Sequence, residues 1–113
     1  MKKITLIVLG IAVLIIAVIL IINLMNKPSA ITEREIKCIA GNSTIYTLKT
    51  CTHCQQQKQV LGDYIQFFNN IDCATNMQIC NQNKITAVPT WIINNQSYSG
   101  VKTFAQLKSL TGC

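Results

Sequence analysis

Two cysteines near the middle of the chain have the spacing of a redox pair. Cys51 and Cys54 are separated by Thr52 and His53, so their sulfurs can close a small disulfide ring. If this motif lies where a strand passes into a helix, Cys51 is at the helix N-terminus, where unpaired backbone N–H groups and the helix dipole favour negative charge. A thiolate carries such a charge. We therefore predict Cys51 as the nucleophile and Cys54, one helical turn further on, as the resolving thiol.

Two neighbouring features also favour redox chemistry. His53 directly precedes Cys54, and an imidazole near the Cys51 sulfur would stabilise the thiolate and make the disulfide a stronger oxidant. The alternative for His53 is a solvated surface histidine. Val88-Pro89 precedes a predicted strand, and we expect a cis proline that lies opposite the cysteines, with the Val88 backbone free to pair with an extended substrate. The alternative is an ordinary trans proline in a turn.

The elements that must position these residues alternate between strands and helices. Periodicity, β-forming residues and turn signals predict them. They are a strand at 44–49, a helix at 54–61 ended by Gly62, a strand at 71–73, a helix at 75–83 capped by Thr75, a hairpin of strands 91–93 and 96–98 around Asn94-Asn95, and a helix at 103–110. This order predicts an α/β domain. A short helix at 31–39, with a Thr32 and Glu35 capping box, precedes it.

The N-terminal segment is long and apolar enough to cross a membrane. Ile4–Ile22 contains no charged residue, and at about 1.5 Å per residue its helix nearly spans a hydrocarbon core of roughly 30 Å. We predict a transmembrane signal-anchor at 1–25, a linker with a short helix at 26–42 and the folded domain at 43–113. A cleaved signal peptide is the alternative, but its nearest cleavage site, Pro28-Ser29-Ala30, has proline where a small residue is expected.

The charges indicate topology rather than nucleic-acid binding. Lys2 and Lys3 favour a cytoplasmic N-terminus, which would place the C-terminal domain outside the cytoplasm, in a periplasm, at a cell surface or in a lumen. The chain has a net charge of +6, but no basic run with interleaved aromatic residues. We therefore expect no nucleic-acid partner. Beyond residue 44 the charges are scattered over Lys49, Lys58, Asp63, Asp72, Lys84, Lys102 and Lys108.

The ordered combination of motifs resembles a thioredoxin-fold oxidoreductase, and in particular the small thioredoxin-like domain associated with vitamin K epoxide reductase homologues. The resemblance spans roughly Ser43 to Leu110. It implies a glutaredoxin-sized thioredoxin-like domain that exchanges disulfides with protein thiols without a cofactor, and a separate quinone-linked membrane redox partner. It rests on Thr50-Cys51-Thr52-His53-Cys54 with Gln56, Lys58 and Gly62, on Cys73 and Cys80, on Val88-Pro89-Thr90-Trp91 and on Tyr98-Ser99-Gly100.

The sequence departs from this family at several positions. Lys49, Thr50 and Thr52 stand where the family often has an aromatic residue and a proline, and Val88 stands where it often has an aromatic residue. These differences bear on the redox potential and on the substrate groove. The strand before the motif also contains no acidic residue that would assist the second cysteine.

The other four cysteines suggest further links. The resemblance and the short spacing pair Cys73 with Cys80 as a structural disulfide, with a second redox pair as the alternative. Cys38 and Cys113 could pair and join the two ends of the domain, remain free thiols or link two chains. A zinc site is the rival to redox chemistry, although the second cysteine spacing is wider than that of a zinc ribbon. Its ligands would be Cys51, Cys54, Cys73 and Cys80.

Together these observations predict a membrane-anchored thiol-disulfide oxidoreductase that promotes disulfide formation in protein clients outside the cytoplasm. A disulfide reductase or isomerase is the first alternative, because the same exchange runs in both directions. A non-catalytic, membrane-tethered binding module is the second. We expect no metal.

Overall fold

The chain consists of a long N-terminal helix and a compact domain. The computed structural model describes residues 1–26 and 30–113, and the chain divides into two units at residues 30 and 31. Helix α1, Lys2–Met25, is long and apolar enough to span a membrane. In lipid, which offers no hydrogen bonds, a helix of this kind would satisfy its own backbone groups. Pro28 and Ser29 of the alternative cleavage site lie outside the described residues.

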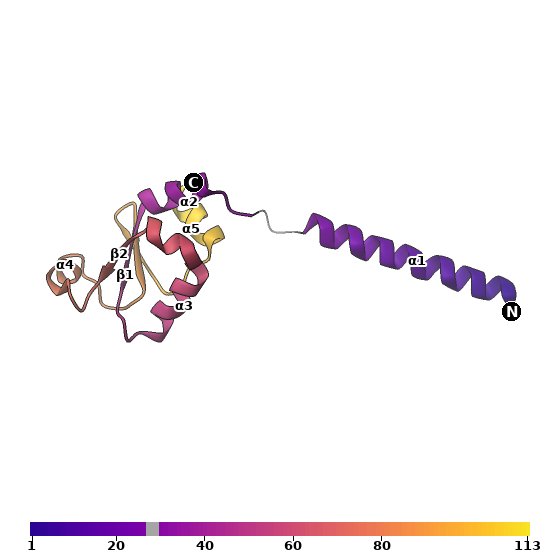
Figure 1. Ribbon diagram of the computed structural model, residues 1–113, viewed down its shortest axis with the longest axis horizontal. Helices are drawn as coiled ribbons and strands as arrows, with labels where there is room; N and C mark the ends of the chain where they lie inside the picture. The colour runs from indigo at the N-terminus through magenta and orange to yellow at the C-terminus, as the bar shows by residue number, and fades with distance from the viewer. Residues whose placement is uncertain (27–29) are drawn as a thin grey trace. The chain divides into compact units, whose positions relative to one another are not determined.

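The domain is built on a four-stranded mixed sheet (Figure 1). The strand order is β2-β1-β3-β4, with β1 parallel to β2 and antiparallel to β3, and β3 antiparallel to β4. Since Tyr46 near the end of β1 lies opposite Thr90 at the start of β3, the segment after β1 and the segment before β3 meet at one edge. The strands are β1 (Ser43–Thr47), β2 (Asn69–Asp72), β3 (Thr90–Ile93) and β4 (Gln96–Ser99).

The predicted hairpin is present between β3 and β4. Asn94 and Asn95 connect the two strands and have φ angles of 51° and 62°. Positive φ at both central residues is typical of the type I′ turn, whose twist matches that of the two strands it connects. Asparagine tolerates positive φ better than most residues. The sequence pair Asn94-Asn95 thus fixes the register of the edge strand.

Five short helical segments complete the domain. Helices α2 and α5 each begin with a complete capping box, formed by Thr32 with Glu35 and by Thr103 with Gln106. The five segments are α2 (Glu33–Gly41), α3 (Thr52–Leu61), the 3₁₀ helix η1 (Gly62–Phe67), α4 (Met77–Gln82) and α5 (Phe104–Thr111).

Helix α4 differs from the prediction. It is shorter than the predicted helix at 75–83, and Thr75 does not cap it. The Thr75 hydroxyl instead donates to the Asp72 carbonyl at 3.2 Å, because the chain turns tightly after β2. The Asp72 carboxylate accepts from the Ala74 N–H at 2.9 Å in the same turn. This turn carries the chain from the sheet edge into α4.

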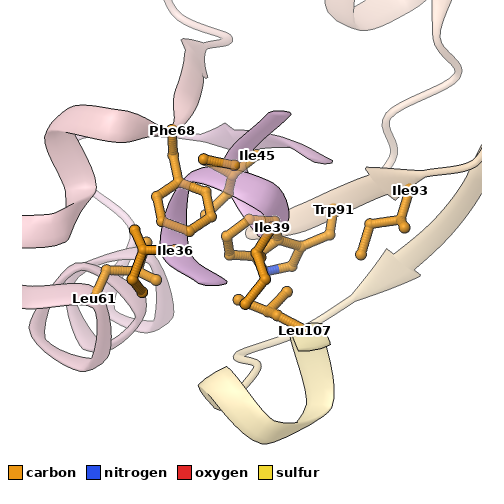
Figure 2. Close-up of a cluster of buried hydrophobic side chains, with 9 residues drawn as sticks. Ile36, Ile39, Ile45, Leu61, Phe68, Trp91, Ile93 and Leu107 are labelled. Atoms are coloured by element: carbon orange, nitrogen blue, oxygen red, sulfur yellow. The ribbon is translucent and has the colours of Figure 1, made fainter. Parts of the chain in front are cut away.

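The hydrophobic core forms where α2, α3 and α5 pack against β1 and β3. Trp91 of β3 is fully buried at its centre and meets Phe68 edge-to-face, with ring centroids 5.6 Å apart. Figure 2 shows side chains of α2, α3 and α5 gathered around these strands. The buried cluster consists of Ile36, Ile39, Ala40, Ile45, Leu61, Phe68, Trp91, Ile93 and Leu107.

Helix α2 belongs to the folded domain, which corrects the predicted boundary at residue 43. Ile36 and Ile39 are completely buried in the core, and the compact unit begins at Ile31. Ile36, Ile39 and Ala40 are spaced so that they share one side of α2. This apolar side is buried against the rest of the domain. The segment 26–42 is therefore not simply a linker with an independent helix.

Candidate functional site

The Cys-x-x-Cys motif lies at the sheet edge where β1 gives way to α3. Thr47 ends β1, and a turn closed by the Cys51 N–H donating to the Leu48 carbonyl at 3.3 Å leads into the helix. Cys51 is the N-cap of α3, which begins at Thr52, earlier than the predicted start at Cys54. Its sulfur takes the place of a capping side-chain oxygen, and this explains the earlier start.

The sulfur of Cys51 is held by backbone groups from two parts of the chain. It accepts from the Cys54 N–H at 3.1 Å and lies 3.5 Å from the Val88 carbonyl oxygen, to which its S–H donates. An N–H directed at the sulfur from the first turn of a helix stabilises negative charge on it. Cys51 is partly exposed, so an incoming thiol can reach this sulfur.

The second sulfur lies in a different environment. Cys54 is a free thiol like Cys51, but it lies on the core-facing side of α3 and is fully buried. Burial and, to a smaller extent, the hydrogen bond with the Cys51 side chain raise the pKa of the Cys54 thiol to about 11. Near neutral pH Cys54 therefore stays protonated. The pair offers one accessible sulfur and one shielded sulfur, as nucleophilic attack followed by resolution requires.

His53 does not contact the cysteine sulfurs through a hydrogen bond. Its side chain is exposed, and its Nδ1 lies 3.0 Å from Oε1 of Gln56, one turn further along α3. Within the described part of the chain this is the ring's only hydrogen bond. The expected contact with Cys51 is absent because position 53 faces solvent on this helix, while Cys54 faces the core.

The Val88-Pro89 segment lies against the motif. The peptide bond between these residues is cis, and Pro89 is fully buried while Val88 is partly exposed. The Pro89 carbonyl accepts from Gly100 at 2.8 Å, which ties the segment to the end of β4. In the regions that the structure describes, the Val88 N–H has no hydrogen-bond acceptor. The structure therefore leaves a backbone donor without a partner close to the Cys51 sulfur.

The other four cysteines form two disulfides. Cys73 at the end of β2 is bonded to Cys80 of α4, and Cys38 of α2 is bonded to Cys113, the last residue. Two of the four sulfurs of the rival zinc site are thus joined to each other. Residues 1–26 and 30–113 contain no group of three or more histidine, cysteine or acidic residues arranged to hold a metal ion.

Gln57 is a buried residue of the site that sequence reasoning missed. It lies one turn after Cys54 on the same side of α3 and has no exposed surface. Its Oε1 accepts from Trp91 Nε1 at 3.1 Å and from the Lys102 N–H at 2.6 Å, and its Nε2 donates to the Lys102 carbonyl at 3.0 Å. Gln57 therefore fixes the motif helix to β3 and to the segment before α5.

Comparison with known proteins gives a weak sequence match and a fold. No protein-family model matches the chain. It is 31% identical over 71 residues to the thiol-disulfide oxidoreductase LTO1 of Arabidopsis thaliana, a match that covers 55% of this chain and 19% of that protein. The chain thus spans about a fifth of the length of this curated relative.

Solved structures share the arrangement of the domain. The NTD_N/C domain of alkylhydroperoxide reductase AhpF from Enterococcus faecalis superposes with a TM-score of 0.50 at 18% identity, over 74% of this chain and 45% of that one. The oxidised thioredoxin of Plasmodium falciparum matches with a TM-score of 0.45 at 17% identity, over 73% of this chain and 90% of that one. The predicted thioredoxin-like α/β fold, with an N-terminal helix apolar enough to cross a membrane, is confirmed.

Proposed function

We propose that this protein is a membrane-anchored thiol-disulfide oxidoreductase that exchanges a Cys51–Cys54 disulfide with protein thiols. The arrangement of the two sulfurs carries the proposal. Cys51 is accessible at a helix N-terminus and accepts the Cys54 N–H, while Cys54 is buried one turn behind it. The sequence similarity to part of an oxidoreductase named for the same chemistry supports it.

The proposed reaction begins with the oxidised pair. A client thiolate attacks the Cys51 sulfur, a bond forms between client and Cys51, and the Cys51–Cys54 bond breaks with its electron pair on Cys54, which is then protonated. A second client thiolate attacks the client sulfur of this mixed disulfide and releases Cys51. The client has lost two electrons and gained a disulfide, and the pair has become a dithiol. In the opposite direction, Cys54 attacks the mixed disulfide and releases a reduced client.

The pair must be reoxidised before the next cycle. By resemblance, we propose a separate quinone-linked membrane protein of the vitamin K epoxide reductase type as the electron acceptor. Helix α1 would hold the domain close to such a partner. We also propose that the N-terminus is cytoplasmic, as Lys2 and Lys3 favour, and that the domain works outside the cytoplasm.

The test is oxidation of a reduced client by the full chain in detergent. We expect stoichiometric loss of client thiols with the wild-type protein after oxidation of its motif, and none with Cys51→Ser. Cys38→Ser/Cys113→Ser is the control, since it replaces cysteines of the same domain but leaves the motif. Client oxidation that survives Cys51→Ser would contradict the proposal.

The direction of exchange depends on the reduction potential of the pair. We expect equilibration with glutathione to give a potential well above that of thioredoxin, about −270 mV. A value near or below that figure would favour a disulfide reductase instead.

A further inference from the structure

The Cys38–Cys113 disulfide reaches the surface of the domain. Cys38 is exposed and Cys113 is half-buried, and Figure 1 shows the C-terminus beside α2. The other disulfide differs, because only 4% of the surface of Cys80 is exposed and the bond holds the short helix α4 to β2. A thiolate in solution can therefore approach Cys38 more easily than it can approach Cys80.

A side-chain amide lies against both sulfurs of the exposed disulfide. Asn42 is the C-cap of α2, and its Nδ2 donates to the Cys38 carbonyl at 2.9 Å, which holds the amide in place. The same Nδ2 lies 3.9 Å from Sγ of Cys38 and 3.8 Å from Sγ of Cys113. Reduction of a disulfide releases one sulfur as a thiolate, and an N–H beside that sulfur stabilises the developing negative charge.

A positive charge lies one helical turn before Cys38. Arg34 and Cys38 are four residues apart on α2, a spacing that places them on the same side of the helix, and both are exposed. Within the part of the chain that the structure describes, Arg34 forms no ion pair, whereas Lys37 pairs with Glu33. The Arg34 guanidinium is therefore available to attract an incoming thiolate.

The contacts between α2 and α5 do not depend on the disulfide. Ile36 and Ile39 of α2 and Leu107 of α5 are fully buried in one core cluster. An ion pair between Glu35 and Lys108 joins the same two helices. After reduction these contacts keep the two thiols near each other, so the bond re-forms readily and opens only with a strong reductant. The disulfide therefore stays closed in the presence of client thiols.

We propose that Cys38–Cys113 is a second site of thiol-disulfide exchange, which a strongly reducing dithiol opens independently of the motif. One thiolate of the dithiol attacks Sγ of Cys38 and forms a mixed disulfide. The Cys38–Cys113 bond breaks with its electron pair on Cys113, which is then protonated. The second thiol of the reductant attacks the mixed disulfide and releases Cys38, so the pair gains two electrons and two protons and the dithiol becomes a disulfide.

This exchange has a consequence for the domain. Opening the bond frees the last residue from α2 and removes a link that spans most of the folded chain. Since such a link stabilises a domain by restricting its unfolded state, the stability of this domain becomes sensitive to strong reductants.

The test uses the full chain in detergent with Cys51→Ser/Cys54→Ser, so that the two disulfides are the remaining cysteine pairs. Dithiothreitol is added in excess and free thiols are alkylated at successive times. Peptide mapping by mass spectrometry then gives the rate at which each disulfide is reduced, and near-ultraviolet circular dichroism reports whether the protein stays folded. We expect Cys38–Cys113 to be reduced roughly tenfold faster than Cys73–Cys80 in the folded protein, because its sulfurs are more accessible.

Asn42→Ala tests the amide beside the sulfurs. It should slow reduction of the exposed disulfide roughly threefold, because the released thiolate loses its donor. Asn83→Ala is the matched control and should leave this rate unchanged. Asn83 is the C-cap of α4 and donates from Nδ2 to the Ile79 carbonyl at 2.9 Å, as Asn42 does on α2, but its amide bonds no sulfur.

Three results would overturn the proposal. These are equal rates for the two disulfides, an unchanged rate in Asn42→Ala, and reduction of Cys38–Cys113 only together with unfolding. Each of them leaves the proposed function intact, because the tested variant lacks both cysteines of the motif. Faster reduction of the folded protein that slows in Asn42→Ala and not in Asn83→Ala supports a second exchange site.

Discussion

The two sulfurs of the motif differ in exposure, and this difference should appear in their reactivity. Cys51 is partly exposed, whereas Cys54 is buried and burial raises the pKa of its thiol to about 11. We expect iodoacetamide at neutral pH to alkylate Cys51 of the reduced protein and to leave Cys54 unmodified. Peptide mapping by mass spectrometry measures this, and equal modification of both cysteines would contradict the geometry of the site.

The same burial makes stability depend on pH in the alkaline range. The folded state favours the neutral Cys54 thiol, so this contribution is complete below the ordinary pKa of 9.0 and is lost as pH rises toward 11. We expect the reduced protein to lose more stability over this range than Cys54→Ala does, measured by urea unfolding. Tyr46, whose pKa is also raised by burial, titrates in both proteins and cancels in the comparison.

Gln57 should be among the most sensitive polar residues of the domain. Replacing it with leucine leaves the Trp91 indole N–H and the Lys102 N–H without their acceptor. An unpaired buried group costs about 1–3 kcal/mol, and the Lys102 N–H is only partly buried and costs less, so we expect Gln57→Leu to lower the free energy of unfolding by about 2–4 kcal/mol. Gln59→Leu is the control on the same helix, where the residue is exposed.

In the control the change should stay within about 0.5 kcal/mol, as for most surface substitutions. Chemical denaturation of the two variants measures the difference. If both variants unfold at the same denaturant concentration, Gln57 does not connect α3 to β3 as described.

At this scale the sequence allowed the placement of the motif to be predicted but not its surroundings. Spacing and neighbouring periodicity are local properties, and they predicted that Cys51 lies at a strand-to-helix junction and that a cis Val88-Pro89 bond lies beside it. Gln57 stands in a run of three glutamines, Gln55, Gln56 and Gln57, and nothing local distinguishes the buried one. Only the packing of α3 on Trp91 does so, and that contact joins residues far apart in sequence.

Helices α2 and α5 are connected by an ion pair that should make stability depend on pH in the acidic range. Glu35 bonds Lys108 of α5 and also accepts from the Thr32 backbone. The bond with Lys108, followed by the bond from Thr32, lowers the pKa of Glu35 from 4.5 to about 2. A lowered pKa stabilises the fold above pH 4.5, and this stabilisation is lost as pH falls toward 2.

We therefore expect Glu35→Gln to flatten the decline in stability between pH 4.5 and 2. Glu33→Gln is the matched control, since Glu33 pairs with Lys37 on the exposed side of the same helix and that pair does not involve α5. Urea unfolding at several pH values in this window measures both variants. An equally steep decline in Glu35→Gln and in the wild type would contradict the assigned role of Glu35.

Among the elements, those with strong local signals were predicted well. The Thr32 and Glu35 capping box, the Asn94-Asn95 turn and Gly62, whose φ of 53° suits glycine, marked the ends of segments. The position of α2 in the core could not be predicted, because its partners in α5 lie at the other end of the chain. The start of α4 was mispredicted because Thr75 bonds the preceding turn instead.

For the whole domain, the two disulfides should differ in what they contribute. Cys38 and Cys113 are 75 residues apart, whereas Cys73 and Cys80 are seven apart. In the chain-entropy model these loops correspond to about 4.5 and about 2.3 kcal/mol. We expect the double serine variant of the first pair to be less stable than that of the second by about 2 kcal/mol in denaturant unfolding. The reverse order would contradict this account.

The molecule as a whole combines an apolar helix with a domain that has its own core. The domain from Ile31 onward contains the core and both disulfides. Cys51, Cys54 and Val88 lie at one edge of its sheet. The segment after β1, helix α3 and the segment before β3 meet there, so the proposed chemistry depends on the fold as a unit.

The most direct test of the central claim is to trap the exchange intermediate in native membranes. In Cys54→Ser, the Cys51 thiolate attacks a client disulfide and forms a mixed disulfide that position 54 can no longer resolve, so we predict thiol-cleavable adducts of the full chain on non-reducing gels. Cys51→Ser and the double variant Cys51→Ser/Cys54→Ser should give none. Adducts of equal abundance with and without Cys51, or no adducts in any variant, would contradict disulfide exchange through Cys51.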